Sequence, residues 1–324
     1  MPKSDPVEKA LNALGELRYS SSPEAVAKEL RIHLANKSNL VVAKAAKITG
    51  ELHATELISA LVAAFERLMK DPQRLDKRCA AVTEIVSALY ELDYCEPEVY
   101  LRGLRHVQME ASFGPPVDTA APLRGMCAQG LLRTRCRDAI TEVLPVLVDH
   151  EPPARLGAVR ALALNGGDAG VLLLRLKVLT GDSEPEVLRE CFSGLLAAAP
   201  ECSLAFVAKY VDDEDEMTVE AAIWALGESR LPSALEILKE KWERTVDREA
   251  RKILLAALAA SRLQEALDFL CLQLRTANSR TANDVLQALA PYAGSESIRK
   301  AVAAAVQERE EASVTAAFNE RFSR

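Results

Sequence analysis

The stretch from Asp149 to Gly181, DHEPPARLGAVRALALNGGDAGVLLLRLKVLTG, contains one structural unit and decides the fold. An acidic residue precedes a proline turn at Pro152, and a helix rich in small residues follows. A glycine turn at Gly166 then leads into a second helix that is rich in leucine. Because proline favours the first turn of a helix and glycine its end, the stretch predicts two helices joined by a short turn.

The same unit recurs along the chain at a nearly constant spacing. Small residues that precede a leucine, as Ala161 does, recur at Gly130, Gly194, Ala225, Ala257 and Ala288. The successive gaps, with Ala161 included, are 31, 33, 31, 32 and 31 residues. A period in this range with two helices per unit is typical of an α-solenoid. We therefore predict an all-α solenoid of about nine antiparallel helix pairs.

Composition supports this fold class and narrows the class of partner. The chain is 49% hydrophobic but only 5% aromatic, and no long stretch alternates with period two. Such a chain suits closely packed helices rather than a sheet. The formal net charge of −7 argues against a protein that wraps nucleic acid, because that function needs a continuous basic surface.

Targeting signals and cysteine usage favour a cytoplasmic protein. The first residues lack an apolar core, so no signal peptide is expected, and no apolar stretch is long enough to span a bilayer. The seven cysteines are scattered and lie mostly within apolar helical patterns. We interpret them as reduced thiols of the core rather than as disulfides or metal ligands.

The helical periodicity divides the chain into a cap and an array. Residues 1–22 are expected to form an N-terminal capping helix with a Ser20-Ser21-Ser22-Pro23 turn, and 23–324 a single solenoid. The expected helix pairs are 24–35 with 39–50, 54–70 with 75–92, 97–109 with 118–133, 136–148 with 153–164, 168–180 with 185–198, 201–211 with 216–228, 232–244 with 247–260, 263–275 with 279–291, and 295–308 with 311–322.

At residues 219–241, VEAAIWALGESRLPSALEILKEK, the pattern resembles the HEAT repeat. The resemblance is strongest to the short bacterial form that also occurs in phycobilisome-lyase-like proteins, and it covers nearly all of the chain from about residue 23. It implies a right-handed, HEAT-like superhelix whose second helices line the concave face. HEAT-type motifs are specific for the fold, and they say little about function.

The resemblance also implies a ladder of charged side chains between neighbouring repeats. Asp149 and Arg155, six residues apart, match the acidic–arginine pair of HEAT arrays, and Asp182 with Arg189 is a looser match. The arginine is missing after Val219, so the ladder should be interrupted there.

The repeat spacing is irregular around residues 108–118, QMEASFGPPVD, where glycine and two prolines break the helical pattern. One interpretation is a longer connector whose Phe113 packs back on the helices. The other is an insertion that reaches a binding surface with Phe113, since insertions in repeat proteins often map to the binding face.

Motifs for catalysis and metal binding are lacking. The four histidines lie far apart, and there is no zinc-binding, phosphate-loop or nucleophile-elbow motif. The acidic run from Asp212 to Glu216 is interpreted as the solvated start of a helix, with a landing patch for a basic partner segment as the alternative. We predict no metal, no cofactor and no catalytic residues.

The second helices offer a candidate binding groove. The two positions before each small repeat residue are expected to point partly into it, and this row becomes apolar and aromatic in the middle of the chain. Alternatively, one residue of each pair packs against the adjacent helix. Candidate partner-binding residues are Arg160, Phe192, Ile223 and Trp224, because exposed aromatic and arginine side chains often anchor interfaces.

We therefore predict a non-catalytic, monomeric scaffold or adaptor that binds a protein or peptide partner along its concave face. Two alternatives rest on family resemblance. One resembles the HEAT-like bilin lyases and would hold a small ligand in the groove. The other resembles the HEAT-like DNA glycosylases, against which the net charge argues.

Overall fold

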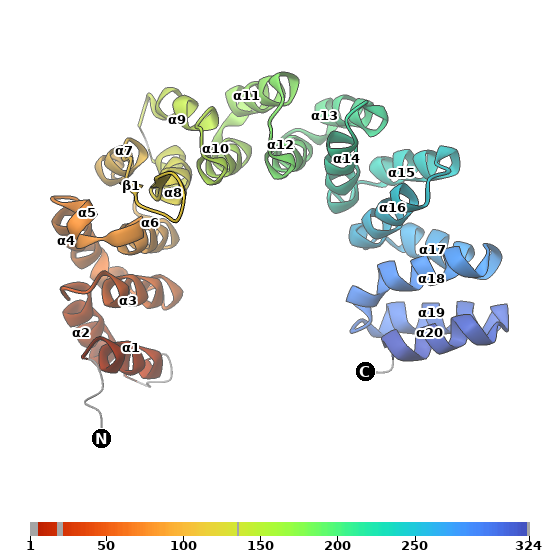
Figure 1. The fold of residues 1–324 in the computed structure, drawn as a ribbon, viewed down its shortest axis with the longest axis horizontal. Helices are drawn as coiled ribbons and strands as arrows, with labels where there is room; N and C mark the ends of the chain where they lie inside the picture. The colour runs from red at the N-terminus through yellow and green to blue at the C-terminus, as the bar shows by residue number, and fades with distance from the viewer. Residues whose placement is uncertain (1–5, 18–21, 135, 323–324) are drawn as a thin grey trace. The chain divides into compact units, whose positions relative to one another are not determined.

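The computed structural model describes residues 6–17, 22–134 and 136–322, which are largely helical (Figure 1). They contain 20 α-helices, four short 3-10 helices and one two-stranded hairpin. The fold is an all-α solenoid, as the repeat spacing predicted. The chain divides into two compact units, unit 1 from Met1 to Leu173 and unit 2 from Leu174 to Arg324. The expected turn residues Ser20 and Ser21 lie outside the described residues.

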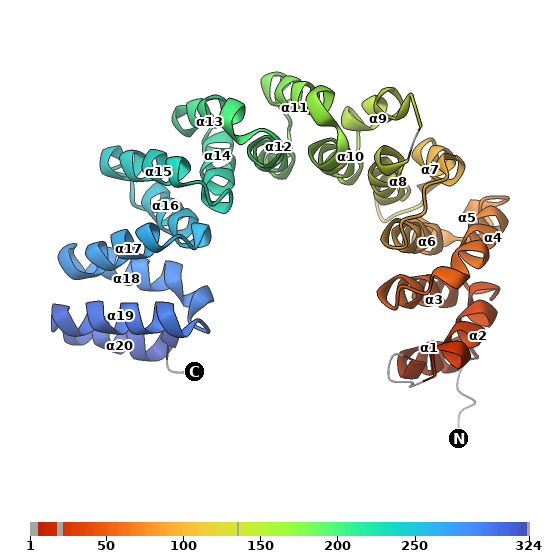
Figure 2. The same cartoon turned by 180° about the vertical axis from the view of Figure 1, so that it is seen from behind.

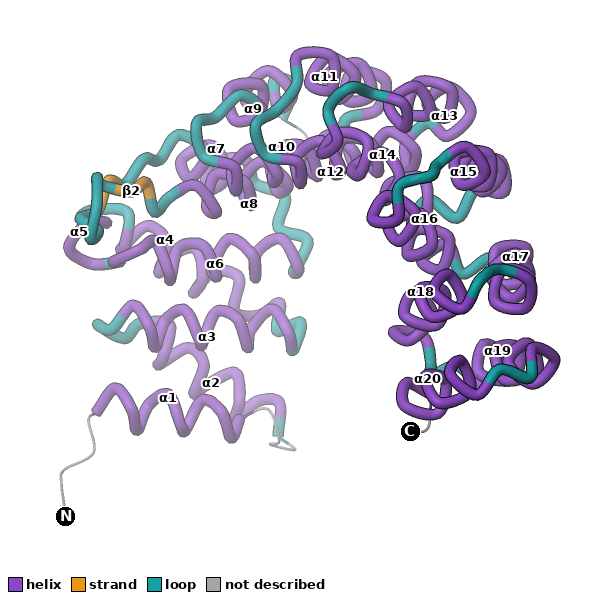
Figure 3. Tube along the Cα trace, turned by 45° about the vertical axis from the view of Figure 1, so that its right-hand side comes forward, coloured by secondary structure: helices purple, strands orange, loops and turns teal. Residues whose placement is uncertain are grey.

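In unit 1 the helices alternate between two layers, and Figure 3 shows α1, α3 and α6 of one layer stacked in chain order. That layer consists of α1 (Pro6–Leu17), α3 (Asn39–Glu51), α6 (Ala80–Glu91), α8 (Ala121–Arg133) and α10 (Pro152–Asn165). The other consists of α2 (Pro23–Leu34), α4 (Ile58–Leu68), α7 (Pro97–Leu104) and α9 (Ala139–Leu147). Short helices at Thr55–Leu57, Pro72–Leu75 (α5) and Lys77–Cys79 connect them.

Unit 2 repeats this arrangement, and the layer formed by its second helices is visible from both sides in Figures 1 and 2. That layer consists of α12 (Pro185–Ala198), α14 (Glu216–Glu228), α16 (Arg248–Ser261), α18 (Ser279–Leu289) and α20 (Ala312–Phe322). The other consists of α13 (Pro200–Ala208), α15 (Pro232–Arg244), α17 (Gln264–Thr276) and α19 (Glu296–Arg309). The division between the units falls within α11 (Gly167–Thr180). Two 3-10 turns, Lys209–Asp212 and Ala290–Tyr292, follow α13 and α18.

Local sequence explains where these helices begin. Proline occupies the first helical position of α2, α7, α10, α12, α13 and α15, where its missing N–H costs nothing. Some of the other helices begin with a side-chain cap: before α14, a carboxylate oxygen of Asp215 accepts a hydrogen bond from the Thr218 amide at 3.0 Å. Asn278 caps α18 in the same way, through the Thr281 amide at 2.9 Å.

Small residues set the packing between second helices. Gly125 of α8 faces Gly157 of α10, and a Cβ at Gly157 would clash with the Gly125 backbone. The two helices therefore approach backbone to backbone, as the small-residue pattern of the sequence suggested. Leucine and β-branched side chains such as Ile85 and Leu162 fill the remaining space of the core.

The segment after α7 differs from the expected helix 97–109. The helix ends at Leu104, and the chain then forms a hairpin of β1 (Met109–Glu110) and β2 (Val117–Asp118). The strands are antiparallel, with Met109 opposite Asp118 and Glu110 opposite Val117. Two prolines at the tip cannot donate the backbone hydrogen bonds that a helix requires, so the segment turns back on itself instead.

Candidate functional site

A common register decides which side chains of the second helices reach the surface. In five successive pairs the first residue is buried and the second lines a surface cavity. The buried residues are Val82, Ala128, Val159, Phe192 and Ile223, and their cavity-lining neighbours are Thr83, Gln129, Arg160, Ser193 and Trp224. Each pair thus contributes one core residue and one surface residue, because adjacent helical positions point about 100° apart.

Phe192 and Ile223 therefore do not lie in a groove, which corrects the expectation drawn from the sequence. Phe192 is completely buried, and its ring centre lies 5.1 Å from that of Tyr210. Ile223 is 2% exposed and belongs to the same core. Of the four expected groove residues, Arg160 is exposed on α10 and Trp224 is half-buried on α14.

The cavity beside Trp224 lies between α12 and α14 of unit 2. Its volume is about 410 Å³, and it is lined by Pro185, Glu186, Arg189, Met217, Glu220, Ala221 and Trp224. The indole Nε1 of Trp224 donates a hydrogen bond to a Glu220 carboxylate oxygen at 3.3 Å. The Arg189 guanidinium lies over the indole, 5.8 Å from the ring centre, and Met217 is 56% exposed. The cavity thus combines an aromatic wall, an apolar thioether and two carboxylates.

A second cavity of about 260 Å³ lies on the same pair of helices. It is lined by Ser193, Leu196, Ala197, Ala225, Glu228 and Ser229. An ion pair of 2.8 Å between Arg189 of the first cavity and Glu228 of the second connects the two. We call the surface formed by both cavities the α12–α14 groove.

Arg160 lines a separate cavity within unit 1. This cavity of about 320 Å³ lies among α6, α8 and α10, and Glu84 and Gln129 also line it. Burial raises the pKa of the Glu84 carboxyl; Lys47 opposes that shift, and the carboxylates of Glu91 and Glu51 add to it. The lining contains no aromatic side chain.

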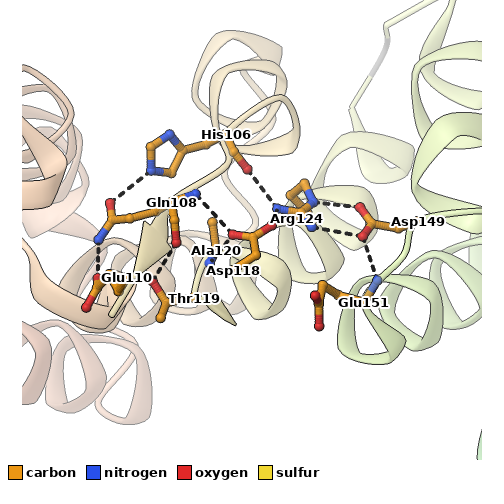
Figure 4. Close-up of polar contacts among 9 residues, drawn as sticks. All are labelled: His106, Gln108, Glu110, Asp118, Thr119, Ala120, Arg124, Asp149 and Glu151. Carbon is orange, nitrogen blue, oxygen red and sulfur yellow. Dashed lines mark hydrogen bonds and ion pairs between the residues drawn. The ribbon is translucent and has the colours of Figure 1, made fainter. Parts of the chain in front are cut away.

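At the start of α8, unit 1 contains a buried charge network, shown in Figure 4. The Arg124 guanidinium donates to both oxygens of Asp149, at 2.7 and 2.9 Å, and to Asp118 at 2.7 Å. It also donates to the His106 carbonyl at 2.9 Å. Only 6%, 9% and 15% of the Arg124, Asp118 and Asp149 side chains is exposed, so the three are nearly removed from water.

Electrostatics within the network favour the charged forms of Arg124 and Asp118. Burial alone would lower the pKa of Arg124, but hydrogen bonds to Asp149 and Asp118 outweigh it and hold the pKa above its usual value. For Asp118, burial by itself would raise the pKa. Hydrogen bonds from the Gln108 and Ala120 amides and from Arg124 lower the pKa by more than burial raises it. The net result is a lowered pKa, typical of a carboxylate with several donors.

The structure gives contacts for each of the expected ladder residues. Arg155 donates to the backbone carbonyls of Asp149 and His150, each at 2.9 Å, while the Asp149 carboxylate binds Arg124. Arg189 pairs with Glu228 rather than with Asp182. Asp182 instead forms an ion pair with Lys177 at 2.8 Å. Arg124 and Arg189 thus contact carboxylates of a later helix pair, whereas the two carbonyls that Arg155 contacts lie in the turn before its own helix.

The hairpin holds Phe113 at its tip, fully exposed, so the interpretation in which this ring packs back on the helices is wrong. Polar groups hold the base of the hairpin. Gln108 donates to the Asp76 carbonyl at 2.9 Å, and Glu110 accepts from the Arg78 amide. Glu110 also accepts from Thr119 at 3.1 Å, and Figure 4 shows Gln108, Glu110 and Thr119 together. These hydrogen bonds fasten the base of the hairpin to residues 76–78, while the Phe113 ring at its tip is exposed.

Other reactive groups are dispersed. Within the described residues, no three His, Cys, Asp or Glu side chains are grouped to hold a metal ion. All seven cysteines are free thiols, and burial raises the pKa of Cys79 to about 12 and that of Cys271 to about 11.

The part of the chain that the structure describes contains no helix long and apolar enough to cross a membrane.

Several contributors to the groove and the network were missed by sequence reasoning. Met217, Glu186 and Glu220 line the Trp224 cavity, yet in the sequence they look like ordinary surface residues of two helices. Asp118 was assigned to the insertion, although its position six residues before Arg124 repeats the Asp149–Arg155 spacing. That repeated spacing could have identified Asp118 as part of the network.

A comparison with protein families identifies the repeat in part of the chain. A family model described as HEAT repeats matches residues 172–259, which include α12 and α14, so the chain contains HEAT repeats. Among solved structures, the complex of CpcE and CpcF of phycocyanin lyase from Nostoc sp. PCC7120 is similar, with 13% identity, a TM-score of 0.37, and coverage of 90% of this chain and 96% of that chain. An engineered protein is also similar, with 17% identity, a TM-score of 0.35, and coverage of 99% and 96%. A search of curated proteins finds no match.

Proposed function

We propose that this protein is a non-catalytic interaction scaffold that binds a protein partner in the α12–α14 groove. The observation that supports the proposal best is the half-exposed Trp224 at the wall of an open cavity, beside an exposed methionine and an arginine. Tryptophan and arginine are the residue types most enriched at interface hot spots, and methionine adapts to irregular partner surfaces. The groove also lies within the matched HEAT repeats. We also propose that the protein is monomeric and cytoplasmic.

Two alternative functions, a bilin lyase and a DNA glycosylase, predict that the purified protein carries a different bound molecule. A HEAT-like bilin lyase would retain a coloured ligand, and a DNA glycosylase would retain nucleic acid. The carboxylates that line the groove disfavour nucleic acid, because they repel phosphate groups.

The proposal is tested by site-directed photo-crosslinking in the native cytoplasm. A photoreactive amino acid at Ser193, which lines the groove, should capture a protein partner, whereas one at the exposed Glu265 of α17 should not. Trp224→Ala should abolish capture at Ser193, and Phe113→Ala should leave it intact because that ring lies on the unit 1 hairpin.

Capture that survives Trp224→Ala would contradict the groove. Loss of capture with Phe113→Ala alone would move the binding surface to the hairpin. Co-purified bilin or DNA would support one of the two other functions instead.

A further inference from the structure

We infer that the α12–α14 groove takes a basic peptide segment and that an arginine of that segment lies against Trp224. This inference rests on the proposed function and adds the chemistry of the partner.

The first support is the distribution of charge along the chain. From Asp182, just before α12, to Glu228, the last residue of α14, there are twelve acidic side chains and only two basic ones, Arg189 and Lys209. The net charge of this segment is therefore −10, although that of the entire chain is −7. Within this segment α12 and α14 carry five acidic side chains and one basic one, a net charge of −4, and the remaining excess lies in α13 and the connecting residues. The groove thus lies in the most acidic part of the chain, which favours a basic partner.

Some of these carboxylates are neutralised locally, but those at the cavity are not. Asp212 pairs with Lys241 at 2.8 Å and with Arg244 at 3.3 Å, both from α15. Asp182 pairs with Lys177. Glu186 and Glu220, by contrast, line the cavity without an ion-pair partner among the described residues. The uncompensated negative charge therefore lies beside the aromatic wall.

The second support is the arrangement around the indole. A guanidinium over a tryptophan ring within about 6 Å is a favourable cation–π contact. Arg189 already makes this contact, with its guanidinium 5.8 Å from the ring centre, and Glu228 holds it there. The cavity thus binds an arginine from its own chain, and an incoming arginine can replace it on the same ring.

The third support is the form of the groove. Two cavities of about 410 and 260 Å³ follow one another along α12 and α14, and the Arg189–Glu228 ion pair connects them. Each offers carboxylate oxygens, from Glu186 and Glu220 in the first and from Glu228 in the second. Successive acceptor sites suit an extended segment with more than one basic side chain better than a single small cation.

The test uses the full chain and a fluorescein-labelled tetra-arginine peptide with Gly-Ser spacers, measured by fluorescence anisotropy. Tetra-lysine and tetra-glutamate peptides of the same design serve as comparisons. The arginine peptide should bind more tightly than the lysine peptide, because the planar guanidinium stacks better on the indole, and the glutamate peptide should not bind. Trp224→Ala should weaken arginine-peptide binding on the order of tenfold, and Trp224→Phe less.

Arg189→Ala provides the sharpest variant, because the inference predicts a gain. Removing the competing guanidinium and its positive charge should tighten arginine-peptide binding severalfold, an effect that misfolding cannot produce. Arg280→Ala, which removes the same charge from the exposed start of α18, is the matched control and should change affinity much less. The double variant Glu186→Gln/Glu220→Gln should weaken binding more than Glu243→Gln/Glu265→Gln, which removes equal charge elsewhere in unit 2.

Three results would overturn the inference. Equal losses in the two double variants, with no effect of Trp224→Ala, would mean that the peptide binds through diffuse electrostatics. Binding of the glutamate peptide that is weakened by Arg189→Ala would indicate an acidic partner. Equal competition by spermidine would indicate a small polycation.

The scaffold proposal can fail separately. If Trp224-dependent crosslinking from Ser193 succeeds but the arginine peptide does not bind, the scaffold stands and the basic partner is wrong. If the peptide binds through Trp224 and crosslinking captures no protein, the scaffold proposal itself fails.

Discussion

The Arg124 network of unit 1 and the Arg189–Glu228 pair of unit 2 use charged side chains in opposite ways. At the start of α8, Arg124 is almost fully buried and is fixed by two carboxylates and a carbonyl. Between α12 and α14, Arg189 and Glu228 form an ion pair in which each side chain is at least 40% exposed. A buried charge must keep all its partners, because water cannot replace them. An exposed pair is worth little to stability, so its members can exchange partners when another molecule binds.

This comparison teaches where to look for structure and where to look for function in a repeat protein. Both arginines lie at repeat boundaries, and they look alike in the sequence. Only burial separates a side chain that joins repeats from one that is available for recognition. Four substitutions test this distinction, and their expected effects on stability decrease in order.

Arg124→Met should have the largest effect. The variant keeps an apolar side chain of similar length but leaves Asp118 and Asp149 buried without their cation, which should cost about 3–5 kcal/mol. Urea unfolding followed by circular dichroism gives the change in the free energy of unfolding. A loss below about 1 kcal/mol would place Arg124 with the exposed pairs and remove the contrast between the two sites.

Gly157→Ala should destabilise unit 1 by about 1–3 kcal/mol, because the added methyl group forces α10 away from the Gly125 backbone of α8. Gly294→Ala is the matched control, since a Cβ there meets nothing within 4 Å. Thermal unfolding of both variants measures the difference. Equal melting temperatures would show that α8 and α10 are not in close contact.

Asp118→Asn should destabilise unit 1 by about 1–2 kcal/mol at pH 7, and the loss should depend on pH. The pKa of Asp118 is lowered in the folded protein, so its carboxylate contributes stability above the unfolded value of about 3.9. That contribution is lost as the pH falls through the folded pKa. Urea titrations between pH 7 and pH 3 should therefore show the two proteins converging in acid, and a constant difference would contradict the assignment.

Glu228→Gln should change stability by less than about 1 kcal/mol, because the Arg189–Glu228 pair is exposed to water. Adding salt should affect this variant and the wild type almost equally in urea unfolding. A loss comparable to that of Arg124→Met would mean that this pair is structural, and it would weaken the case for an exchangeable arginine at Trp224.

The sequence alone determined the helices and their repetition. Prolines at the starts of helices and the periodicity of leucine act within one or two helical turns, so they predict helices without knowledge of the tertiary contacts. The recurrence of small residues every 31 to 33 positions is visible in the sequence itself. They predicted the bounds of α12, α14 and α15 to within a residue. The hairpin escaped this reasoning because its strands are two residues long and are held by Asp76 and Thr119 rather than by a sequence pattern.

Only the tertiary structure decided which side chains form the candidate site. The sequence proposed Ile223 and Trp224 together, and the packing of neighbouring helices buried the first and left the second beside a cavity. Arg189 forms its ion pair with Glu228, which lies 39 positions later in the sequence, so no local pattern predicts the pair. Helical periodicity fixes the direction of a side chain along its own helix, but burial and pairing depend on what the adjacent helix brings to the same place.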